Sequence, residues 1–365
     1  MKILEITSDL DGGGVDRLLY DYCSKLAKNI QFDFIVTSKG EGILEKPLKD
    51  LGCNVYHIPQ IREDFKAHSK ELERILKSNS YDIIHDHSGY KAWCNLRVAK
   101  KVGVPVRIAH SHQAYMVESF KQKIERKLSA PITKFFATEL FACGNDAAKW
   151  MWGKRSLRKG NVYIMKNAVN AESFSFSAQK RSAIRAELGI EDKFVVGNVA
   201  RFSFQKNHEF LIRVFAELKK ICDGAVLLLV GRGETEDEIR SLVKDLELDD
   251  SVVFMGVRND VPDLLNAFDT FVLPSRFEGL PVTLVEIQAN GLPAVISDSV
   301  TQEMKISDDL NFIPLSIPAG EWAKAISEKH RNRSENLIIN TPYDLKKATD
   351  ELKLKYLSLK EKTSV

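Results

Sequence analysis

Two glutamates stand eight positions apart around a Gly-Leu-Pro turn in the segment RFEGLPVTLVE, residues 276–286. Because proline favours the first position of a helix, the pattern predicts a helix over Pro281–Asn290. Glu278 then precedes the helix, and Glu286 lies near its sixth position. A carboxylate can accept hydrogen bonds from both hydroxyls of a vicinal diol, so we expect the pair to hold sugar hydroxyls.

The backbone of the same turn is suited to a phosphate. The amides of Gly279, Leu280 and Val282 point into the space between the glutamates, at a helix N-terminus that attracts negative groups. A nucleotide sugar has hydroxyls at both ends and a diphosphate between them. A helix-dipole partner plus a surface glutamate is the ordinary alternative. A glycoside hydrolase pair is disfavoured, because its carboxylates flank the scissile bond from different elements.

A basic pair follows a predicted strand in VARFSFQKNHEF. Arg201 and Lys206 lie just past the strand and before a predicted helix over Asn207–Lys219. Ligands bind at this edge of a parallel sheet. A guanidinium and an ammonium at a helix N-terminus suit a diphosphate, and a solvated loop is an equal alternative.

Three consecutive glycines join the first predicted strand to its helix in SDLDGGGVDRLL. Gly13 and Gly14 let the backbone approach an anion closely, although an ordinary tight turn shows the same pattern. Arg17 stands where the dinucleotide fingerprint needs glycine, which disfavours a dinucleotide-dependent oxidoreductase. Asp9 and Asp11 have no further oxygen ligands nearby in the sequence, so a divalent metal is disfavoured there.

Four histidines occur as two H-x-H pairs, each at the end of a predicted strand: His85 and His87 in IIHDHSGY, and His110 and His112 in IAHSHQAY. Zinc is one interpretation. Such pairs on adjacent strand ends more often line a cleft and bind a substrate through hydrogen bonds, so we expect no metal.

Short apolar runs alternate with amphipathic stretches along the whole chain, as in parallel sheets covered by helices. The strands predicted in the first half are Lys2–Thr7, Phe32–Thr37, Asn54–His57, Asp82–His85, Val106–His110 and Glu139–Cys143, with helices such as Asp16–Lys28 and Lys66–Ser78 between them. Five further buried-strand runs follow in the second half. The pattern predicts two doubly wound α/β domains joined in the polar segment Lys166–Ser182.

We therefore expect an N-terminal domain over residues 1–170, a second domain over 171–340 and a closing helix over 341–365. Thr341 is a suitable N-cap for that helix and Pro342 a suitable first residue.

Composition is that of a globular protein, 44% hydrophobic and 28% charged over 365 residues. The sequence has no run of about 18 apolar residues, and the apolar stretch at Met1 is too short for a signal peptide. Five cysteines without a C-x-x-C pair suit a reducing compartment. These features predict a cytoplasmic protein.

Charge is divided unevenly along the chain. Residues 1–167 carry 28 Lys and Arg against 19 Asp and Glu, a net charge of +9, whereas the remainder carries −6. Such an excess of positive charge favours binding to anionic partners, which include phosphorylated acceptors, anionic lipids and nucleic acid. Five basic residues lie among apolar ones in Phe120–Phe136. An amphipathic membrane-surface helix and a solvated helix face are equal interpretations, because Pro131 interrupts the period.

Taken together, these motifs resemble the retaining nucleotide-sugar glycosyltransferases of family 4. The resemblance spans DGGGVDR, YDIIHDH, RIAHSHQAY, KNAVNAESF, VARFSFQKNHEF, LLLVGRGE and the long segment from VVFMGVRND through RFEGLPVTLVE to PAVISD. It implies the GT-B architecture, in which two Rossmann-like doubly wound domains face each other and the C-terminal helix crosses back to the first. Within the family the chain is most similar to bacterial exopolysaccharide and capsule transferases.

The resemblance also implies roles for individual residues. Glu278 would lie at the donor hexose, Glu286 at the ribose, and Arg201 with Lys206 at the diphosphate. His112 would lie near the anomeric carbon, with His110 as the neighbouring alternative, because the H-S-H spacing allows either register. The implied catalytic residues are His112, Arg201, Lys206 and Glu278; the implied donor-binding residues are Gly13, Gly14, Arg201, Lys206, Gly256, Val257, Arg258, Glu278, Gly279, Leu280, Pro281, Val282 and Glu286; the acceptor-side candidates are His85, His87 and His110.

The family commonly has glutamate where Asp16 stands and glycine where Ala200 stands. Neither difference removes an ionic contact to a donor. The resemblance implies metal-independent transfer of a hexose, without a bound cofactor, from a UDP-sugar to a saccharide or a polyprenyl-diphosphate-linked saccharide. GDP-mannose is the alternative donor. Peripheral association with an anionic membrane is a further expectation, and we expect no nucleic-acid partner. A nucleotide-sugar epimerase and a non-catalytic nucleotide-sugar binder are the alternative functions.

Overall fold

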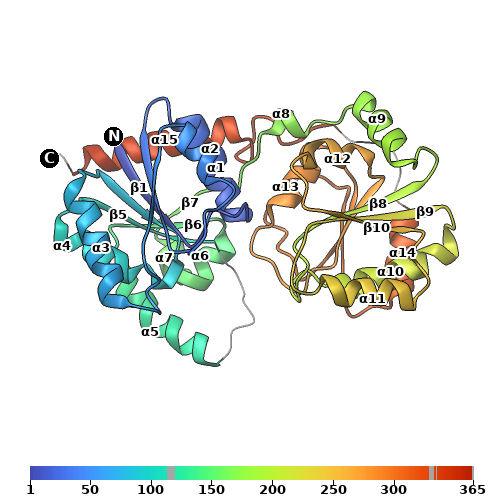
Figure 1. The fold of residues 1–365 in the computed structure, drawn as a ribbon, viewed down its shortest axis with the longest axis horizontal. Helices are drawn as coiled ribbons and strands as arrows, with labels where there is room; N and C mark the ends of the chain where they lie inside the picture. Colours follow the sequence, from blue (N-terminus) through green and yellow to red (C-terminus); the bar gives the residue numbers. More distant parts are fainter. Residues whose placement is uncertain (113–119, 329–332, 334, 364–365) are drawn as a thin grey trace. The chain divides into compact units, whose positions relative to one another are not determined.

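The computed structural model describes residues 1–112, 120–328, 333 and 335–363, and the chain divides into two α/β units (Figure 1). Unit 1 comprises Met1–Val169 together with Leu345–Val365, and unit 2 comprises Asn170–Asp344. The first crossing between units lies inside the polar segment 166–182. The last segment of the chain returns to unit 1, as the resemblance implied.

Unit 1 is built on seven parallel strands in the order β3-β2-β1-β4-β5-β6-β7. The strands are β1 (Lys2–Thr7), β2 (Gln31–Val36), β3 (Asn54–His57), β4 (Ile83–Asp86), β5 (Val106–Ser111), β6 (Glu139–Ala142) and β7 (Val162–Ile164). Their central members are continuous buried runs, which is typical of a parallel sheet with both faces covered. Each predicted strand of this half is present, with ends that differ by at most one residue.

Helices cover both faces of this sheet. Figure 1 shows α1 (Gly14–Leu26), α2 (Glu45–Asp50) and α15 (Leu345–Glu361) on one face, and α3 (Phe65–Ser78), α4 (Trp93–Val102) and α5 (Phe120–Phe136) on the other. The remaining helices of the unit are the 3-10 turn η1 (Gly89–Lys91), α6 (Asn145–Trp152) and α7 (Lys154–Arg158).

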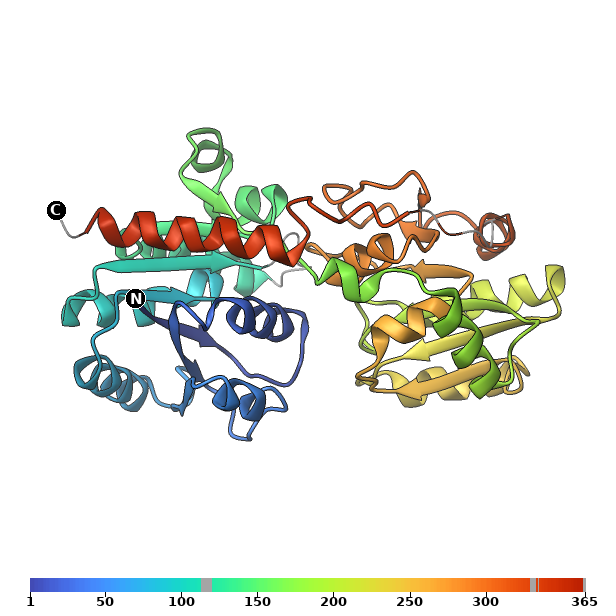
Figure 2. The same ribbon diagram turned by 90° about the horizontal axis from the view of Figure 1, so that it is seen from above.

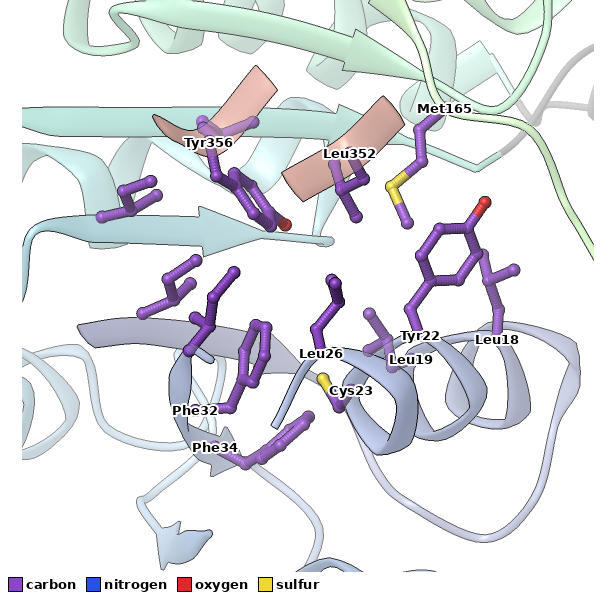
Figure 3. Close-up of a cluster of buried hydrophobic side chains, with 14 of the residues drawn as sticks. Leu18, Leu19, Tyr22, Cys23, Leu26, Phe32, Phe34, Met165, Leu352 and Tyr356 are labelled. Carbon is purple, nitrogen blue, oxygen red and sulfur yellow. The ribbon is translucent and has the colours of Figure 1, made fainter. Parts of the chain in front are cut away.

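The core on the α1 face is completed by the end of the chain. Figure 3 shows side chains of α1 and β2 facing Leu352 and Tyr356 of α15. Leu352 is 2% exposed and Tyr356 is 1% exposed. Burying each such side chain contributes about 1.5–3 kcal/mol, so α15 is an integral part of unit 1 rather than an appendage.

The predicted start of the closing helix, with Pro342 as its first residue, was wrong by three residues. α15 begins at Leu345, after a turn in which the backbone amide of Asn340 donates to the Asp344 carboxylate over 3.0 Å. Asn340 has a φ of 63°, a conformation that asparagine tolerates, so the chain turns before it can become helical. Figure 2 shows α15, in red, running alongside the strands of unit 1.

Pro131 does not interrupt α5, contrary to the expected break in the helical period. The helix runs through Pro131, although proline costs a backbone hydrogen bond. Contacts just after it hold the helix: Thr133 is fully buried and its hydroxyl donates to the Tyr90 carbonyl over 2.7 Å, and Lys134 donates to the Trp152 carbonyl. Tertiary packing therefore overrides the local preference.

Unit 2 repeats the architecture with six parallel strands in the order β10-β9-β8-β11-β12-β13. The strands are β8 (Phe194–Val199), β9 (Ala225–Val230), β10 (Val252–Gly256), β11 (Thr270–Leu273), β12 (Ala294–Ser297) and β13 (Leu310–Ile313); the helices are α8 (Ala171–Phe174), α9 (Ala178–Leu188), α10 (His208–Ile221), α11 (Glu236–Asp245), α12 (Val261–Ala267), α13 (Val282–Ala289) and α14 (Ala319–Ser327). Both units are thus doubly wound parallel sheets, the two Rossmann-like domains of the predicted GT-B class.

Helix α13 is shorter than predicted. It spans Val282–Ala289, and Pro281 is the residue before it, with a φ of −66° and a ψ of 121°. The extended ψ of Pro281 takes it out of the helix while its φ remains compatible with the turn. None of the described helices is both long enough and apolar enough to span a bilayer.

Candidate active site

An ion pair lies at the C-terminal ends of β8 and β11 in unit 2. Lys206 Nζ is 2.5 Å from Glu278 Oε1, although the two residues are 72 positions apart. Ser275 donates its hydroxyl to the same carboxylate oxygen over 2.7 Å, and Gln205 donates Nε2–H to the other oxygen over 3.0 Å. The side chains of Lys206 and Glu278 are 18% and 6% exposed. Glu278 is thus held rigidly by three donors.

Asn207 fixes the direction in which Lys206 points. Its φ of 59° is left-handed, a conformation that asparagine tolerates better than most residues, and it serves as the N-cap residue of α10. Its side chain donates to the Pro274 carbonyl over 3.1 Å, and the Arg276 amide donates to the Gln205 carbonyl over 2.8 Å. These bonds tie the loop after β8 to the loop after β11.

Arg201 has a different environment from Lys206. Its side chain is 74% exposed, and its guanidinium lies 3.2 Å from the Glu234 carboxylate. An exposed pair of this kind contributes at most about 1 kcal/mol, so the guanidinium can exchange partners at little cost. The predicted basic pair therefore consists of one partly buried ammonium fixed by Glu278 and one exposed guanidinium.

The segment Gly256–Arg258 ends β10 at the same sheet edge. Gly256 has a φ of 64°, which favours glycine, and its carbonyl accepts the Gly231 amide over 2.8 Å. Arg258 forms a bidentate pair with Asp260, with distances of 2.7 and 2.5 Å, and Val257 is 62% exposed. The loops after β9 and β10 are thereby joined. That they hold a nucleotide base remains a prediction.

Helix α13 presents its N-terminus next to Glu278. The segment Gly279–Pro281 leads directly into Val282, the first helical residue. The first turn of a helix leaves backbone amides without intrahelical acceptors, which suits an anion. Glu286 is half-buried on the same helix. The assigned contacts of Glu286 and of these amides with a donor remain predictions.

The glycine-rich turn of unit 1 is closed by Asp16. The Asp16 carboxylate accepts the Gly13 amide over 3.0 Å, and a Cβ at Gly13 would lie 3.2 Å from it. Gly14 is the first residue of α1. Burial, together with the nearby Asp9 carboxylate, raises the pKa of Asp16 to about 8. The turn therefore presents a partly protonated acidic group beside its backbone amides.

All four predicted histidines lie together on one face of the unit 1 sheet. Glu5 is paired in register with His85, and His85 with Ile108, so side chains at two-residue intervals from these positions share that face. His85 Nε2 lies 3.0 Å from His110 Nδ1, and His87 Nδ1 lies 2.7 Å from His112 Nε2. The predicted position of the two pairs at adjacent strand ends is confirmed, and His85 and His110 are fully buried there. Their binding to an acceptor remains a prediction.

The cluster continues at both ends into residues that we did not expect. Glu5 Oε2 lies 2.8 Å from His87 Nε2, and the Tyr356 hydroxyl lies 2.8 Å from His85 Nδ1. Burial is the main cause that holds the pKa values of His85 and His110 well below the ordinary range. These rings are therefore neutral near pH 7.

The geometry of the cluster favours a hydrogen-bonded network over a metal centre. One nitrogen each of His85, His87 and His110 lie within 4.8 Å of one another, a spacing that a metal ion could use. Both nitrogens of His85 and both of His87 already have hydrogen-bond partners. Of the six nitrogens only His110 Nε2 is buried without one. A metal would have to break several of these bonds.

Some contacts of the candidate residues were missed by sequence reasoning. Glu5 had a signal, because it is a charged residue inside the buried strand KILEIT. Gln205 had only its position beside Lys206. Ser275 and Tyr356 had none, because their contacts depend on strand order and on the return of α15.

The chain matches two family models in succession. Residues 12–173 match "Glycosyltransferase Family 4", and residues 180–333 match "Glycosyl transferases group 1". The two matches follow the two units in order.

Curated relatives agree with these matches. EpsF of Bacillus subtilis, which is named as a glycosyltransferase, is 31% identical over 333 residues, covering 89% of this chain and 87% of its own. The Escherichia coli UDP-Gal:alpha-D-GlcNAc-diphosphoundecaprenol alpha-1,3-galactosyltransferase is 28% identical over 291 residues, covering 75% and 73% of the two chains.

A solved structure supports the fold. The crystal structure of Anabaena Alr3699/HepE in complex with UDP and glucose matches with a TM-score of 0.82 and 19% identity, covering 98% of this chain and 100% of that one. At this identity the likeness concerns the fold alone. Together with the family models and the relative that is 31% identical over most of both chains, it leads to one assignment: the chain belongs to glycosyltransferase family 4 and is a glycosyltransferase of GT-B fold.

Proposed function

We propose that this enzyme transfers a hexose, with retention of configuration, from a UDP-sugar to a hydroxyl of a polyprenyl-diphosphate-linked saccharide during surface polysaccharide biosynthesis. The observation that carries the proposal is the Lys206–Glu278 pair beside the N-terminus of α13. It combines a fixed ammonium, a hydroxyl-accepting carboxylate and backbone amides, which are the groups that a nucleotide sugar requires.

The donor diphosphate is assigned to Lys206, Arg201 and the segment Gly279–Val282. As the glycosidic bond breaks, negative charge develops on the leaving diphosphate. Cationic groups and amides that are already oriented stabilise this charge more in the transition state than in the ground state. These groups supply the neutralisation that a metal ion gives in other transferases, so we propose that the reaction needs no metal and no cofactor.

Glu278 is assigned to hydroxyls of the donor hexose and Glu286 to those of the ribose. Each oxygen of Glu278 already accepts at least one hydrogen bond, and each retains capacity for another. A leaving phosphate oxygen can take the acceptor's proton on the same face of the sugar, which gives retention without an enzyme nucleophile. His112 of unit 1 is assigned to the sugar near its anomeric carbon.

The acceptor class is supported by the Escherichia coli relative, whose name gives a diphosphoundecaprenol-linked acceptor and UDP-Gal as donor. The Anabaena structure, solved with UDP and glucose, supports the uridine nucleotide. Donor binding identifies the hexose.

Helix α5 supports a site of action at an anionic membrane surface. Its large apolar residues recur on one exposed stripe, where Phe120, Leu128 and Phe135 are 80%, 66% and 70% exposed. Ile124 and Ile132 lie between them at 42% each. Lys121, Lys123, Lys127 and other basic residues flank the stripe, which is the composition of an interfacial helix. We assign this stripe to anionic lipids at the cytoplasmic face.

Donor binding and product analysis together test the proposal. Thermal stabilisation is measured with UDP-glucose, UDP-galactose, UDP-N-acetylgalactosamine and GDP-mannose, since a specific ligand raises stability by mass action. The stabilising donor is then incubated with a polyprenyl-diphosphate saccharide, with and without EDTA, and the anomeric configuration of the product is determined by NMR. An inverted product, loss of turnover with EDTA, or donor epimerisation without acceptor would each contradict the corresponding part of the proposal.

A further inference from the structure

A carboxylate and two imidazoles form a continuous chain of hydrogen bonds in unit 1. Glu5 Oε2 lies 2.8 Å from His87 Nε2, and His87 Nδ1 lies 2.7 Å from His112 Nε2. Glu5 is 2% exposed and the His87 side chain is 1% exposed, whereas His112 is half-buried. The chain therefore runs from a buried charge to a ring that reaches the surface of its unit.

The protons along this chain can be assigned from the chemistry of its members. A carboxylate only accepts, so His87 must donate through Nε2–H. One proton lies between His87 and His112. If His87 is neutral, its Nδ1 accepts and His112 carries its proton on Nε2. The outer nitrogen of His112, Nδ1, is then a bare acceptor, and the described residues offer it no hydrogen-bond partner.

Glu5 supplies the one carboxylate that is paired with these rings among the described residues. Glu5 has no Lys or Arg within 4 Å among the described residues; its ionic partners are His85 and His87. Burial and the neighbouring His87 hold the pKa of His112 well below its ordinary value. The other titratable groups that face the chain are Cys23 of α1, Cys53 just before β3, Tyr356 of α15, and His85 and His110 of β4 and β5. Asp86 is bound to Ser88 and Asn95 instead.

We propose that Glu5 and His87 are positioning residues that hold His112 in its Nε2–H tautomer, so that Nδ1 accepts a hydrogen bond from a hydroxyl of the sugar substrate. The proposal rests on the proposed function for the placement of His112 at the sugar. It assigns a role to Glu5, a residue without substrate contact. The second chain, from Tyr356 through His85 to His110, approaches the first at Glu5, because His85 Nδ1 lies 3.5 Å from the same carboxylate oxygen, but the hydrogen bonds that link its members do not involve His112.

Protonation of His112 reverses its hydrogen-bonding role toward the sugar. A proton that binds His112 Nδ1 allows the Nε2 proton to pass to His87 Nδ1, which leaves a neutral Nδ1–H tautomer at His112 and an imidazolium between His112 and Glu5. The Nδ1–H bond forms as the Nε2–H bond breaks, and the positive charge ends beside the Glu5 carboxylate. His112 then donates to the sugar rather than accepting from it.

The tautomer is tested on the full-length protein by ¹⁵N NMR after selective labelling of histidine, with His112→Gln to assign its signals. We expect the Nε2–H tautomer at pH 8. In Glu5→Gln the glutamine amide can either accept a hydrogen bond from His87 or donate one to it. We therefore expect a mixture of His112 tautomers, and protonation of the His112 ring only at lower pH than in the wild type. Tyr356→Phe is the matched control, because it removes only the bond to His85, and we expect wild-type His112 signals.

Three results would overturn the inference: an Nδ1–H tautomer in the wild type at pH 8, unchanged His112 signals in Glu5→Gln, or stoichiometric metal in the purified protein. Turnover separates it from the proposed function. We expect Glu5→Gln to lower kcat about tenfold or more with little change in donor KM, and Tyr356→Phe to leave both near wild type. If His112→Ala abolishes turnover and Glu5→Gln does not, the positioning role fails. If His112→Ala retains full turnover, the proposed placement of His112 fails instead.

Discussion

Lys206 and Glu278 form a short, largely buried ion pair, with 2.5 Å between ammonium and carboxylate. The charge and the orientation of each residue therefore depend on the other. Lys206 neutralises the charge that Glu278 carries into a nearly closed environment, and Glu278 prevents the lysine side chain from extending into solvent. A donor diphosphate at this position would share the ammonium with a carboxylate that Ser275 and Gln205 still support.

Lys206→Ala is expected to lower kcat by about 10²–10³-fold, as for loss of other preorganised charge-stabilising groups. It should also lower the free energy of unfolding by about 2–4 kcal/mol, because it leaves a buried carboxylate without its partner. Urea unfolding and steady-state kinetics measure the two effects. The double variant Lys206→Ala with Glu278→Gln is the control for stability, which should largely recover. Full turnover in a folded Lys206→Ala protein would show that Lys206 is only structural.

Arg201→Ala should affect the reaction without affecting the fold. The Arg201–Glu234 pair is exposed, so its loss changes the free energy of unfolding by less than about 1 kcal/mol. Loss of the guanidinium from the diphosphate should reduce kcat/KM by about 10²-fold. Glu234→Ala removes the partner that Arg201 has in this structure and should leave kcat/KM near wild type. Equal losses in the two variants would contradict the assignment of Arg201 to the donor.

Asp16 should make stability fall between about pH 4 and pH 8. Its pKa is raised from 3.8 to about 8 in the folded protein, so the folded state binds a proton that the unfolded state has lost over this interval. Raising the pH therefore favours unfolding until the folded pKa is passed. Asp16→Asn removes this titration while its amide oxygen can still accept the Gly13 amide. Melting temperatures of both proteins, measured from pH 5 to pH 9, should depend less on pH in the variant. Parallel pH profiles would refute the raised pKa of Asp16.

Leu352→Ala should lower the free energy of unfolding by about 2–5 kcal/mol, because it opens a cavity between α15 and the core of unit 1. Leu354, on the same helix, is 67% exposed, and Leu354→Ala should change stability by less than about 0.5 kcal/mol. Urea unfolding followed by circular dichroism measures both. Similar small effects would mean that α15 is only loosely attached.

Leu128→Asp should weaken binding of the protein to vesicles of phosphatidylcholine and phosphatidylglycerol about tenfold or more, because burial of one leucine is worth about 1.5–3 kcal/mol. Leu128 and Leu354 are 66% and 67% exposed, so Leu354→Asp is a control of equal exposure on α15, outside the apolar stripe of α5. Co-sedimentation at low salt measures both. Wild-type protein that stays in the supernatant would remove the membrane assignment.

Much of the fold follows from the sequence, because buried parallel strands are continuous apolar runs such as AVLLLV, whose six residues are all buried. The errors occur at prolines. Local preference predicted a break at Pro131 and helix starts at Pro281 and Pro342. In the structure α5 continues through Pro131, where Thr133 packs, and α13 and α15 begin only after the turns that contain Pro281 and Pro342.

The chemistry of individual side chains was predictable, and most of their partners were not. The clustering of the four histidines follows from their positions at the ends of adjacent strands. The bond from Glu5 to His87 requires β1 to lie beside β4, and the bond from Gln205 to Glu278 joins residues 73 positions apart. Such contacts depend on strand order, which a single sequence does not encode locally.

The return of α15 to unit 1 has a consequence for synthesis on the ribosome. The residues of α15 that complete the first core, Leu345 to Leu359, follow all of unit 2 in the chain. Unit 2 can therefore fold while unit 1, translated earlier, still exposes the apolar face of α1 and β2. The domain that is made first is the last to be finished, and its hydrophobic surface must wait for the final helix to emerge.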